Sequence, residues 1–421
     1  MGSRAEHAQL ADWPVMHKAA LMRQFDDWST DRAIRLADLR RFVSDRSRIA
    51  DAYLGRYIVW ESSGSSGEPA IFVQDAASLA VYDAIEAVRQ HHPRPLHRWL
   101  DPWYCTERVA FIGATTGHFA STVSMERLRR INPVLTHAIH HVSFLQSNAA
   151  LARQLERIEP TIIGTYPSTA LLLAEERAAG RLRIAPREIR TGGETLTAQT
   201  RRFVQDTFGC AVIDSYGASE FLTIACECRH RQLHLNSDWL ILEPVDASGR
   251  PTEPGVAGST VLLTNLANLV QPLIRYDLGD RVAVDERRCA CGSPLPVLQV
   301  KGRSDDMLRL EAGGQPAVSI APLALCTVLE DDAGLYDFQL QQTAPGALLL
   351  RTPQRGAAAE ATLRRGRHAL AALLERQGAG HVEIHTATGR PHQIGASGKV
   401  KRILAHAAPA CGRSTARRGD R

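Results

Sequence analysis

Long apolar runs are missing from this sequence, and so is an apolar signal segment among its first residues, Met1–His7. A helix that crosses a bilayer needs about 20 consecutive apolar residues. Blocks of like charge are also missing, because 50 basic and 45 acidic residues are interspersed and the net charge is only +5. These absences predict a cytoplasmic protein with no membrane or nucleic-acid partner.

Cysteine is scarce, with eight residues in a chain of 421, and in the cytoplasm this argues against a disulfide framework. Four of the eight form two Cys-x-Cys pairs, Cys226/Cys228 and Cys289/Cys291. Close pairs of this kind are typical of metal sites. Because His230 and His234 follow the first pair, the candidate ligands outnumber the four that a structural zinc ion takes. Free buried thiols are the alternative.

A serine- and glycine-rich loop lies between two segments with the composition of strands, residues 57–60 and 70–73. Glycine lets backbone N–H groups turn inward and serine adds hydroxyl donors, so such a loop can wrap a polyphosphate. The Walker pattern Gly-Lys-Ser/Thr is missing, which argues against a P-loop. A flexible polar hairpin is the alternative. The candidate phosphate-binding residues are Ser62, Ser63, Gly64, Ser65, Ser66 and Gly67.

Strands and helices alternate through the first half of the chain, which predicts a layered α/β domain with ligand loops at one edge. The first 55 residues and residues 76–89 have apolar side chains at helical spacing. Further strands, some with a following turn, are predicted over residues 108–112, 160–165, 189–194 and 211–215, and further helices over residues 169–179 and 195–208.

Aromatic and polar residues follow three of these strands, where open α/β sheets place ligand loops. His118 and Phe119 follow the first strand, although a core histidine is the alternative for His118. Tyr166 and Ser168 follow the second. The third leads into Tyr216-Gly217-Ala218-Ser219-Glu220, whose tyrosine can stack on a flat ligand and whose glutamate can hold a hard cation. A plain turn with a solvent-facing glutamate is the alternative.

Two strands farther along, residues 239–243 and 260–265, flank a loop rich in Gly and Pro and predict an antiparallel or barrel-like subdomain. Asp280 then ends a strand, where its carboxylate can accept hydrogen bonds from ribose hydroxyls. The chain changes character near residue 306. A small α+β domain is predicted from a hairpin over residues 336–351, a helix over residues 357–376 and a strand over residues 381–386.

Five motifs in a fixed order resemble those of the adenylate-forming enzyme superfamily. They are the serine loop, Tyr216–Glu220, Tyr276–Asp280, Gly302–Asp306 and Ser397–Arg402. The paired cysteines and the compact length are similar to those of the phenylacetate–CoA ligase branch, which includes coenzyme-adenylylating synthetases. The resemblance implies an α/β fold with a large, multi-sheet layered N-terminal domain and a small, mobile α+β C-terminal domain. The expected divisions are residues 1–304, with a zinc-pinned subdomain at about 226–300, residues 305–406, and a disordered tail at 407–421.

The resemblance also implies an AMP-forming acid–thiol ligase that uses ATP, Mg²⁺ and a structural Zn²⁺. Lys399 would act in adenylation, with Lys401 as a nearby competitor, and Asp305 would be the hinge of the small domain. Ser219 and Glu220 would act at the magnesium ion. The remaining ATP-binding residues would be Gly192, Gly193, Glu194, Ser215, Tyr216, Gly217, Asp280 and Arg303. The zinc ligands would be Cys228, His234, Cys289 and Cys291, with Cys226 in place of His234 as the rival set.

The expected substrate pocket contains small and aromatic side chains that suit a flat aryl carboxylate, such as a hydroxybenzoate. Its residues would be His118, Phe119, Tyr166, Ser168 and Ala218. The acceptor thiol would belong to coenzyme A or an acyl carrier protein, and the protein would be a monomer or a homodimer. Glu68 departs from the superfamily pattern, because relatives often have lysine there. Two alternatives stay open: an adenylylating enzyme that forms no thioester, and a non-catalytic zinc-containing binding protein.

Overall fold

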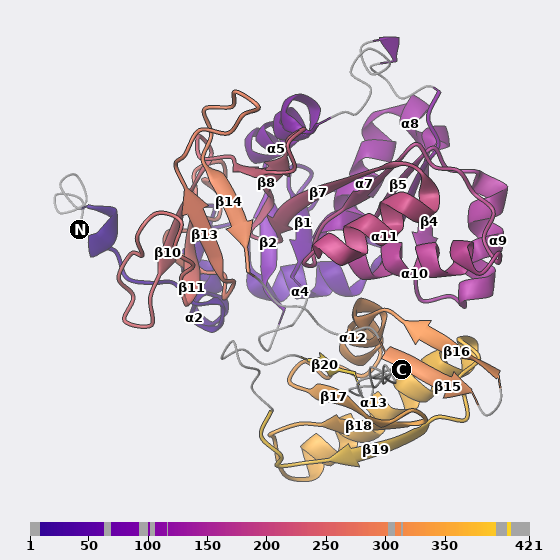
Figure 1. Ribbon diagram of the computed structural model, residues 1–421. Helices are drawn as coiled ribbons and strands as arrows, with labels where there is room; N and C mark the ends of the chain where they lie inside the picture. Colours follow the sequence, from indigo (N-terminus) through magenta and orange to yellow (C-terminus); the bar gives the residue numbers. More distant parts are fainter. Residues whose placement is uncertain are drawn as a thin grey trace, which may run out of the picture.

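Figure 1 shows a large body and a smaller one beneath it in the computed structural model of the chain. The smaller body contains the elements from β15 onward. The expected boundary at residues 304/305 lies outside the described residues and stays a prediction. No helix in the described part of the chain is long and apolar enough to cross a membrane. The structure describes residues 9–62, 69–91, 100–101, 106–115, 117–301, 308–312, 315–392 and 402–405.

A nine-stranded sheet with the order β13-β14-β9-β8-β7-β6-β5-β3-β4 forms the centre of the large body. Strands β4, β3, β5, β6 and β7 pair in parallel, and pairing becomes antiparallel from β7 to β8 onward. The parallel strands are β3 (Val109–Gly113), β4 (Ile139–Ser143), β5 (Ile162–Thr165), β6 (Glu188–Thr191) and β7 (Ala211–Ala218). The antiparallel strands are β8 (Phe221–Glu227), β9 (Leu233–Leu235), β13 (Val282–Asp285) and β14 (Val297–Val300).

Helices connect the parallel strands, because a parallel pair needs a crossover. They are α7 (Ala120–Ile131), α8 (Pro133–Ala138), α9 (Asn148–Ile158), α10 (Pro167–Ala178) and α11 (Ala198–Phe208). The helices predicted over residues 169–179 and 195–208 are confirmed as α10 and α11, and each begins at a different residue from the one predicted. Helix α10 begins earlier, at a proline whose missing N–H costs nothing in the first turn. Helix α11 begins later because the Thr197 side chain accepts a hydrogen bond from Thr200 N and caps it.

A hairpin and a small antiparallel sheet complete the large body, as the sequence predicts. The hairpin is formed by β1 (Ile58–Glu61) and β2 (Ile71–Gln74), followed by α5 (Ala76–Arg89); the three-stranded sheet contains β10 (Leu240–Val245), β11 (Thr260–Asn265) and β12 (Tyr276–Asp277). The N-terminal helical elements are η1 (Leu10–Asp12), α2 (Lys18–Arg23), α3 (Phe25–Trp28), α4 (Leu36–Ser44) and η2 (Arg46–Arg48). Trp60, Phe72 and Phe221 are fully buried in the hydrophobic core that these parts share.

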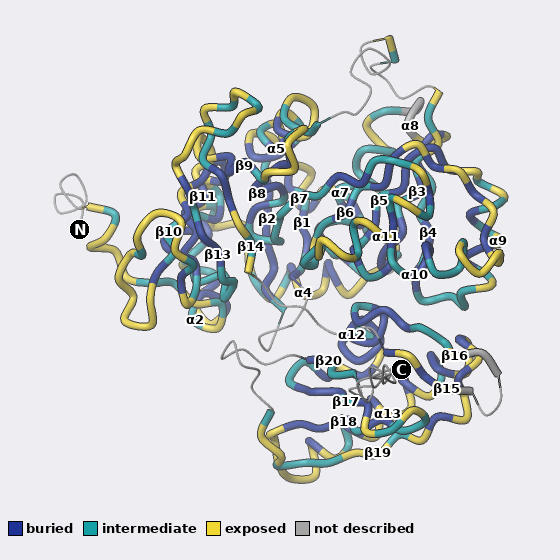
Figure 2. The backbone as a smooth tube through the Cα atoms, in the orientation of Figure 1, coloured by how far each residue is buried: buried dark blue, intermediate teal, exposed yellow. Residues whose placement is uncertain are grey.

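The smaller body has the predicted α+β composition. Its elements are the hairpin β15 (Leu308–Ala312) and β16 (Gln315–Ile320), helices α12 (Pro322–Asp331) and α13 (Ala357–Arg376), and strands β17 (Gln339–Ala344), β18 (Ala347–Arg351), β19 (Glu383–Ala387) and β20 (Ile403–Leu404). The last four strands form a sheet with the order β19-β18-β17-β20. Helix α12 is almost wholly buried (Figure 2), and the sequence reasoning did not identify it.

Polar contacts join the two bodies. Glu175 on α10 pairs with Arg309 and accepts a hydrogen bond of 3.0 Å from the Ser319 hydroxyl. Asn148 donates to the Ser319 carbonyl at 3.3 Å, which extends the same contact to α9. Hairpin β15–β16 therefore lies against the ends of α9 and α10 in this arrangement.

Candidate active site and metal centre

The serine loop is closed at its base by the β1–β2 hairpin. The Ser62 amide donates to the Ala70 carbonyl and the Ser62 hydroxyl accepts from the Ala70 amide, both at 2.9 Å. The predicted residues Ser63, Gly64, Ser65, Ser66 and Gly67 lie outside the described residues. Trp60 connects the hairpin to the turn between β7 and β8, because its indole N–H donates to the Ser219 carbonyl at 2.8 Å. The base of the candidate phosphate loop therefore adjoins the Tyr216–Glu220 motif.

Strand β7 continues farther than the sequence predicts. It runs through Tyr216 and Gly217 to Ala218, so most of the motif lies in a strand, with a register shift at this point, and only Ser219 and Glu220 make the turn. Gly217 has a steric role there. A Cβ atom at this position would lie 1.8 Å from the carbonyl oxygen of Leu222 on β8, which no side chain can occupy.

Tyr216 and Asp280 meet although 64 residues separate them. The tyrosine hydroxyl donates to Asp280 Oδ2 at 2.9 Å. Burial raises the pKa of Tyr216 well above its ordinary value, and the Asp280 carboxylate raises it further, so the hydroxyl keeps its proton. Two motifs that the sequence reasoning assigned to adenine and ribose thus share one hydrogen bond.

Glu220 lies in the turn between β7 and β8, and its surroundings shift the pKa of its carboxyl. Burial raises the pKa of the Glu220 carboxyl, and the negative charge of Asp280 raises it slightly further. A hydrogen bond from the Tyr276 hydroxyl and the positive charge of Lys18 lower it. Asn265 Nδ2 donates to the Glu220 carbonyl at 3.1 Å and holds the turn. A carboxylate that is partly desolvated and lies near a second acid is well placed to bind a divalent cation.

The Gly192-Gly193-Glu194 turn follows β6 and lies next to β7. A Cβ on Gly192 would lie 2.9 Å from the Ser215 hydroxyl, and Gly193 has a φ of +77° beside the Tyr166 ring. Glu194 points to the start of α10, where its two oxygens accept from the Ser168 amide at 2.9 Å and the Ser168 hydroxyl at 3.0 Å. Glu194 and Ser168 therefore cap a helix as a pair.

The expected substrate residues separate into two groups. His118 is fully buried, its ring packs on Phe42, and its Nε2 lies 3.1 Å from the Asp45 carbonyl. A direct substrate contact by His118 is therefore not supported, and the core alternative describes its surroundings. Phe119 forms a backbone bridge with Glu61 of β1, and its ring lies beside Gly117. Tyr166 is the N-cap residue of α10, and its ring lies beside Gly193.

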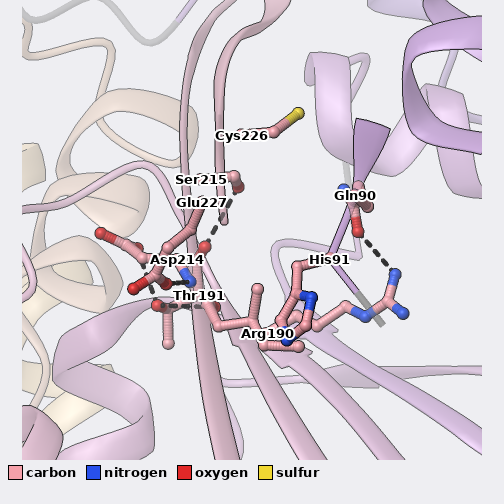
Figure 3. Close-up of a pocket in the computed structure, with 9 residues that line it drawn as sticks. Gln90, His91, Arg190, Thr191, Asp214, Ser215, Cys226 and Glu227 are labelled. Carbon is pink, nitrogen blue, oxygen red and sulfur yellow. Dashed lines mark hydrogen bonds between the residues drawn. The ribbon is translucent and has the colours of Figure 1, made fainter. Parts of the chain in front are cut away.

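A small pocket opens between the end of α5 and strands β6, β7 and β8 (Figure 3). It is lined by Gln90, His91, Arg190, Thr191, Ile213, Asp214, Ser215, Cys226 and Glu227. Burial raises the pKa of Asp214 to about 6, and the Thr191 hydroxyl donates to its Oδ1 at 2.8 Å. The sequence reasoning missed Asp214, although a carboxylate two residues before Tyr216 was a visible signal.

Four side chains from two hairpins converge at the far end of the antiparallel half-sheet. They are Cys228, His234, Cys289 and Cys291, and their ligand atoms all lie within 4.8 Å of one another. Cys228 Sγ lies 3.9 Å from Cys289 Sγ, and Cys291 Sγ lies 3.3 Å from His234 Nε2. With metal–ligand bonds of about 2.0–2.3 Å, a tetrahedral zinc ion needs ligand separations of roughly 3.3–3.8 Å. The Cys291–His234 separation lies within that range and the Cys228–Cys289 separation lies just above it.

The orientation of His234 also suits a metal. Its Nδ1 lies 2.9 Å from the Leu295 carbonyl, so this nitrogen carries the proton and Nε2 faces the three sulfurs. Cys226 is buried on β8 and lines the pocket beside Ser215 instead. The described cluster therefore contains His234 and not Cys226, and the identity of the zinc ligands stays a prediction.

The remaining predicted residues, Arg303, Asp305 and Lys399, lie outside the described residues, and their roles stay predictions. Arg402, which ends the lysine motif, is described. Its guanidinium lies 4.1 Å from the centre of the Phe338 ring, and it forms a buried ion pair with Glu330. The end of the motif is thus fixed in the small body.

The fold is similar to solved structures of a 2-hydroxyisobutyryl-CoA ligase. The structure with 2-HIB-AMP and CoA in the thioesterification state has a TM-score of 0.53 at 18% identity, and the match covers 94% of this chain and 80% of that chain. An open conformation of that ligase gives a TM-score of 0.50 at 18% identity, with 94% and 82% covered. The postadenylation state with 2-HIB-AMP gives 0.50 at 19% identity, with 94% and 80% covered. The sequence matches no protein-family profile and no curated protein.

The chain therefore has the adenylate-forming enzyme fold, and the predicted fold class is confirmed. The similarity covers nearly the whole chain.

Proposed function

We propose that this protein is an ATP-dependent ligase that adenylates a carboxylic acid and then transfers the acyl group to a thiol. One observation carries the proposal: the base of the serine loop, the Tyr216–Glu220 turn and Asp280 meet through the Trp60–Ser219 and Tyr216–Asp280 hydrogen bonds. These segments are far apart in the sequence, and the residues that converge match the superfamily's motifs. Shared fold alone would not support an activity.

In the first half-reaction, a carboxylate oxygen of the substrate attacks the α-phosphorus of ATP. The bond from that phosphorus to the bridging oxygen breaks, and pyrophosphate leaves with the electron pair. The serine loop would hold the β- and γ-phosphates through its hydroxyl and amide donors. Lys399 would stabilise the negative charge that develops during this displacement. Bound Mg²⁺, held by Glu220, would supply further neutralisation of the phosphate charge.

In the second half-reaction, a thiolate attacks the carbonyl carbon of the acyl-adenylate, and AMP leaves. Tyr216 and the Gly192–Gly193 turn would hold the adenine, and Asp280 the ribose, throughout both steps. The C-terminal body would rotate about Asp305 between the steps, withdrawing Lys399 and admitting the thiol. Enclosure between the two bodies protects the adenylate from hydrolysis.

For the substrate, we propose an aryl carboxylic acid, and for the acceptor, coenzyme A or an acyl carrier protein. The Tyr166 ring borders the Gly192–Gly193 turn, and Ala218 ends β7 directly before the Ser219–Glu220 turn, which supports these two residues as substrate contacts. Phe119 would line the same pocket. For the metal centre, we propose a structural zinc ion on Cys228, His234, Cys289 and Cys291. All four tetrahedral positions would be protein ligands, so the ion would stabilise the two hairpins and take no part in the chemistry.

ATP–pyrophosphate exchange across a panel of aryl and aliphatic carboxylic acids, with no thiol present, tests the proposal. Exchange that depends on one acid would demonstrate adenylation and identify the substrate class. Coenzyme A and a loaded carrier protein, added separately, would then distinguish the acceptors. A product that retains AMP with either thiol would favour the adenylylating alternative. No exchange from folded, zinc-loaded protein with any acid would contradict the proposal and favour a protein that only binds.

A further inference from the structure

Glu175, near the end of α10, connects the large body to the small one. Its carboxylate forms an ion pair with Arg309 on β15 and accepts a hydrogen bond of 3.0 Å from the Ser319 hydroxyl on β16. Asn148, at the start of α9, donates to the Ser319 carbonyl at 3.3 Å. These four residues, which we call the interbody latch, join two helices of the large body to one hairpin of the small body.

The position of Glu175 in its own helix does not explain the residue. Helix α10 ends at Ala178, so Glu175 lies in the last turn, where the negative end of the helix dipole disfavours a carboxylate. The next residue, Glu176, lies in the same turn, but its two oxygens accept hydrogen bonds of 2.7 and 2.9 Å from Arg181 of the same body. Two adjacent glutamates therefore have different tasks, and the contact between the bodies is made by Glu175.

The ion pair of the latch consists of groups that water can reach. The exposed fraction of the side chain is 66% for Arg309 and 21% for Glu175. Such a pair contributes little to stability, because water solvates both charges when they separate. The buried pair of Arg402 and Glu330 inside the small body differs, since its separation would leave a charge buried and unpaired. The contact between the bodies can therefore break and form again.

The latch lies between two parts of the proposed catalytic machinery. Arg402, the last residue of the lysine motif, is fixed in the small body by its pair with Glu330, so the orientation of this body determines where the end of the motif lies. At the start of α10, the Ser168 amide and hydroxyl bind Glu194 of the candidate nucleotide site. Helix α10 thus extends from the Gly192–Glu194 turn to the contact with the small body.

We propose that Glu175 is a positioning residue that holds the small body in the observed orientation, and that the interbody latch opens when the enzyme passes between its two half-reactions. The inference rests on the proposed function, in which the two half-reactions need different orientations of the small body. In the second orientation, Glu175, Arg309 and Ser319 face water. The latch thereby sets the populations of the two orientations, and the half-reaction that uses the observed one depends on it.

Charge reversal in the full-length protein tests the assignment. The variants are Glu175→Arg, Arg309→Glu, the double variant with both changes, and the control Glu176→Arg, which alters a glutamate paired within the large body. Two quantities are measured for each. One is the ratio of the rate of ATP–pyrophosphate exchange to the rate of thioester formation, with the acid and the thiol that the wild type uses. The other is the radius of gyration of the protein without ligands, from small-angle X-ray scattering.

Each single reversal should change the ratio of the two rates by about threefold to tenfold, because one half-reaction slows and the other does not. The radius of gyration should rise, since like charges then face each other across the bodies. The double variant restores a pair of opposite charges and should return both quantities to near the wild-type values. Glu176→Arg should change neither quantity.

Wild-type values of both quantities in the two single variants would overturn the assignment. Equal slowing of both half-reactions, or the same changes in Glu176→Arg, would overturn it as well, because these outcomes indicate a general disturbance of the fold. An active wild type leaves the proposed function standing in each of these cases. A folded wild type with no exchange for any acid would overturn the proposed function and the catalytic role of the latch, while the scattering would still decide whether Glu175 holds the small body.

Discussion

The candidate nucleotide site and the candidate metal centre are built in opposite ways. The described part of the candidate nucleotide site collects residues from position 60 to position 280, which hydrogen bonds and close packing hold together. The metal centre takes four ligands from two short hairpins, and its cysteines are only partly buried. The first is therefore stabilised by its surroundings, whereas the second depends on the ion that it would hold. Mutations in the nucleotide site and in the metal centre should therefore have different effects on activity, zinc content and stability.

Replacement of the proposed catalytic lysine should have the largest effect on activity. Lys399→Ala should lower pyrophosphate exchange by about 10²–10³-fold, because a charge positioned for the transition state is lost. Zinc content and the melting temperature should stay as in the wild type, since the candidate metal ligands lie in the large body and far from Lys399 in the sequence. Lys401→Ala is the matched variant and should retain exchange. Full exchange by Lys399→Ala with a loss in Lys401→Ala would reverse the two assignments.

Gly217→Ala should damage the nucleotide site through its backbone. The added methyl group would lie 1.8 Å from the Leu222 carbonyl oxygen, so β7 and β8 must separate. We expect a loss of about 3 kcal/mol in the free energy of unfolding, measured by urea denaturation. Gly346→Ala is the control, because an added Cβ there would meet no atom within 4 Å and the residue has no positive φ. A Gly217 variant as stable as the wild type would contradict the close approach.

Replacement of one candidate zinc ligand should lower the zinc content of the protein and, through the loss of the ion, its stability. Cys289→Ser should reduce bound zinc, measured by elemental analysis, and lower stability by about 2–4 kcal/mol. Cys226→Ser also removes a thiol from this region, but the thiol lies outside the cluster, so zinc content should stay unchanged. Zinc lost from Cys226→Ser and kept by Cys289→Ser would restore the rival ligand set.

Replacement of Asp214 should give the smallest change in the free energy of unfolding, and this change should depend on pH. Burial raises its pKa from 3.8 to about 6 in the folded protein. The folded state therefore binds the extra proton, and the stability contributed by the neutral carboxyl is lost as pH rises from about 4 to about 6. Asp214→Asn should raise the free energy of unfolding by about 1–3 kcal/mol at pH 8 and by little at pH 4.

Asp246→Asn is the control for Asp214→Asn. Hydrogen bonds from Ser248 lower the pKa of the exposed Asp246 carboxyl, so the charged form of Asp246 stabilises the folded protein and its loss should change stability with pH in the opposite direction. Denaturant titrations at both pH values would measure the two variants. A stabilisation by Asp214→Asn that is equal at pH 4 and pH 8 would show that the effect does not come from ionisation.

Local patterns predicted the elements that are strongly periodic or clearly capped. Helices α5 and α13 have the predicted bounds, and the β1–β2 and β17–β18 hairpins lie where turn residues separate apolar runs. The end of β7 was predicted too early, since Tyr216 and Gly217 resemble a turn until β8 pairs with them. Helix α12 was not identified because it is apolar on nearly all sides and therefore lacks an amphipathic period.

The sequence by itself determined which residue types the candidate nucleotide motifs contain, the supply of candidate metal ligands and the alternation of strands and helices, because these depend on residue type and short-range spacing. Only the tertiary structure decided which cysteines meet, that His118 is buried, that Asp214 lines a pocket, and that Tyr216 reaches Asp280. Each of these depends on contacts between segments that are distant in the chain. Such contacts follow from sheet order and packing, which no short window of sequence specifies.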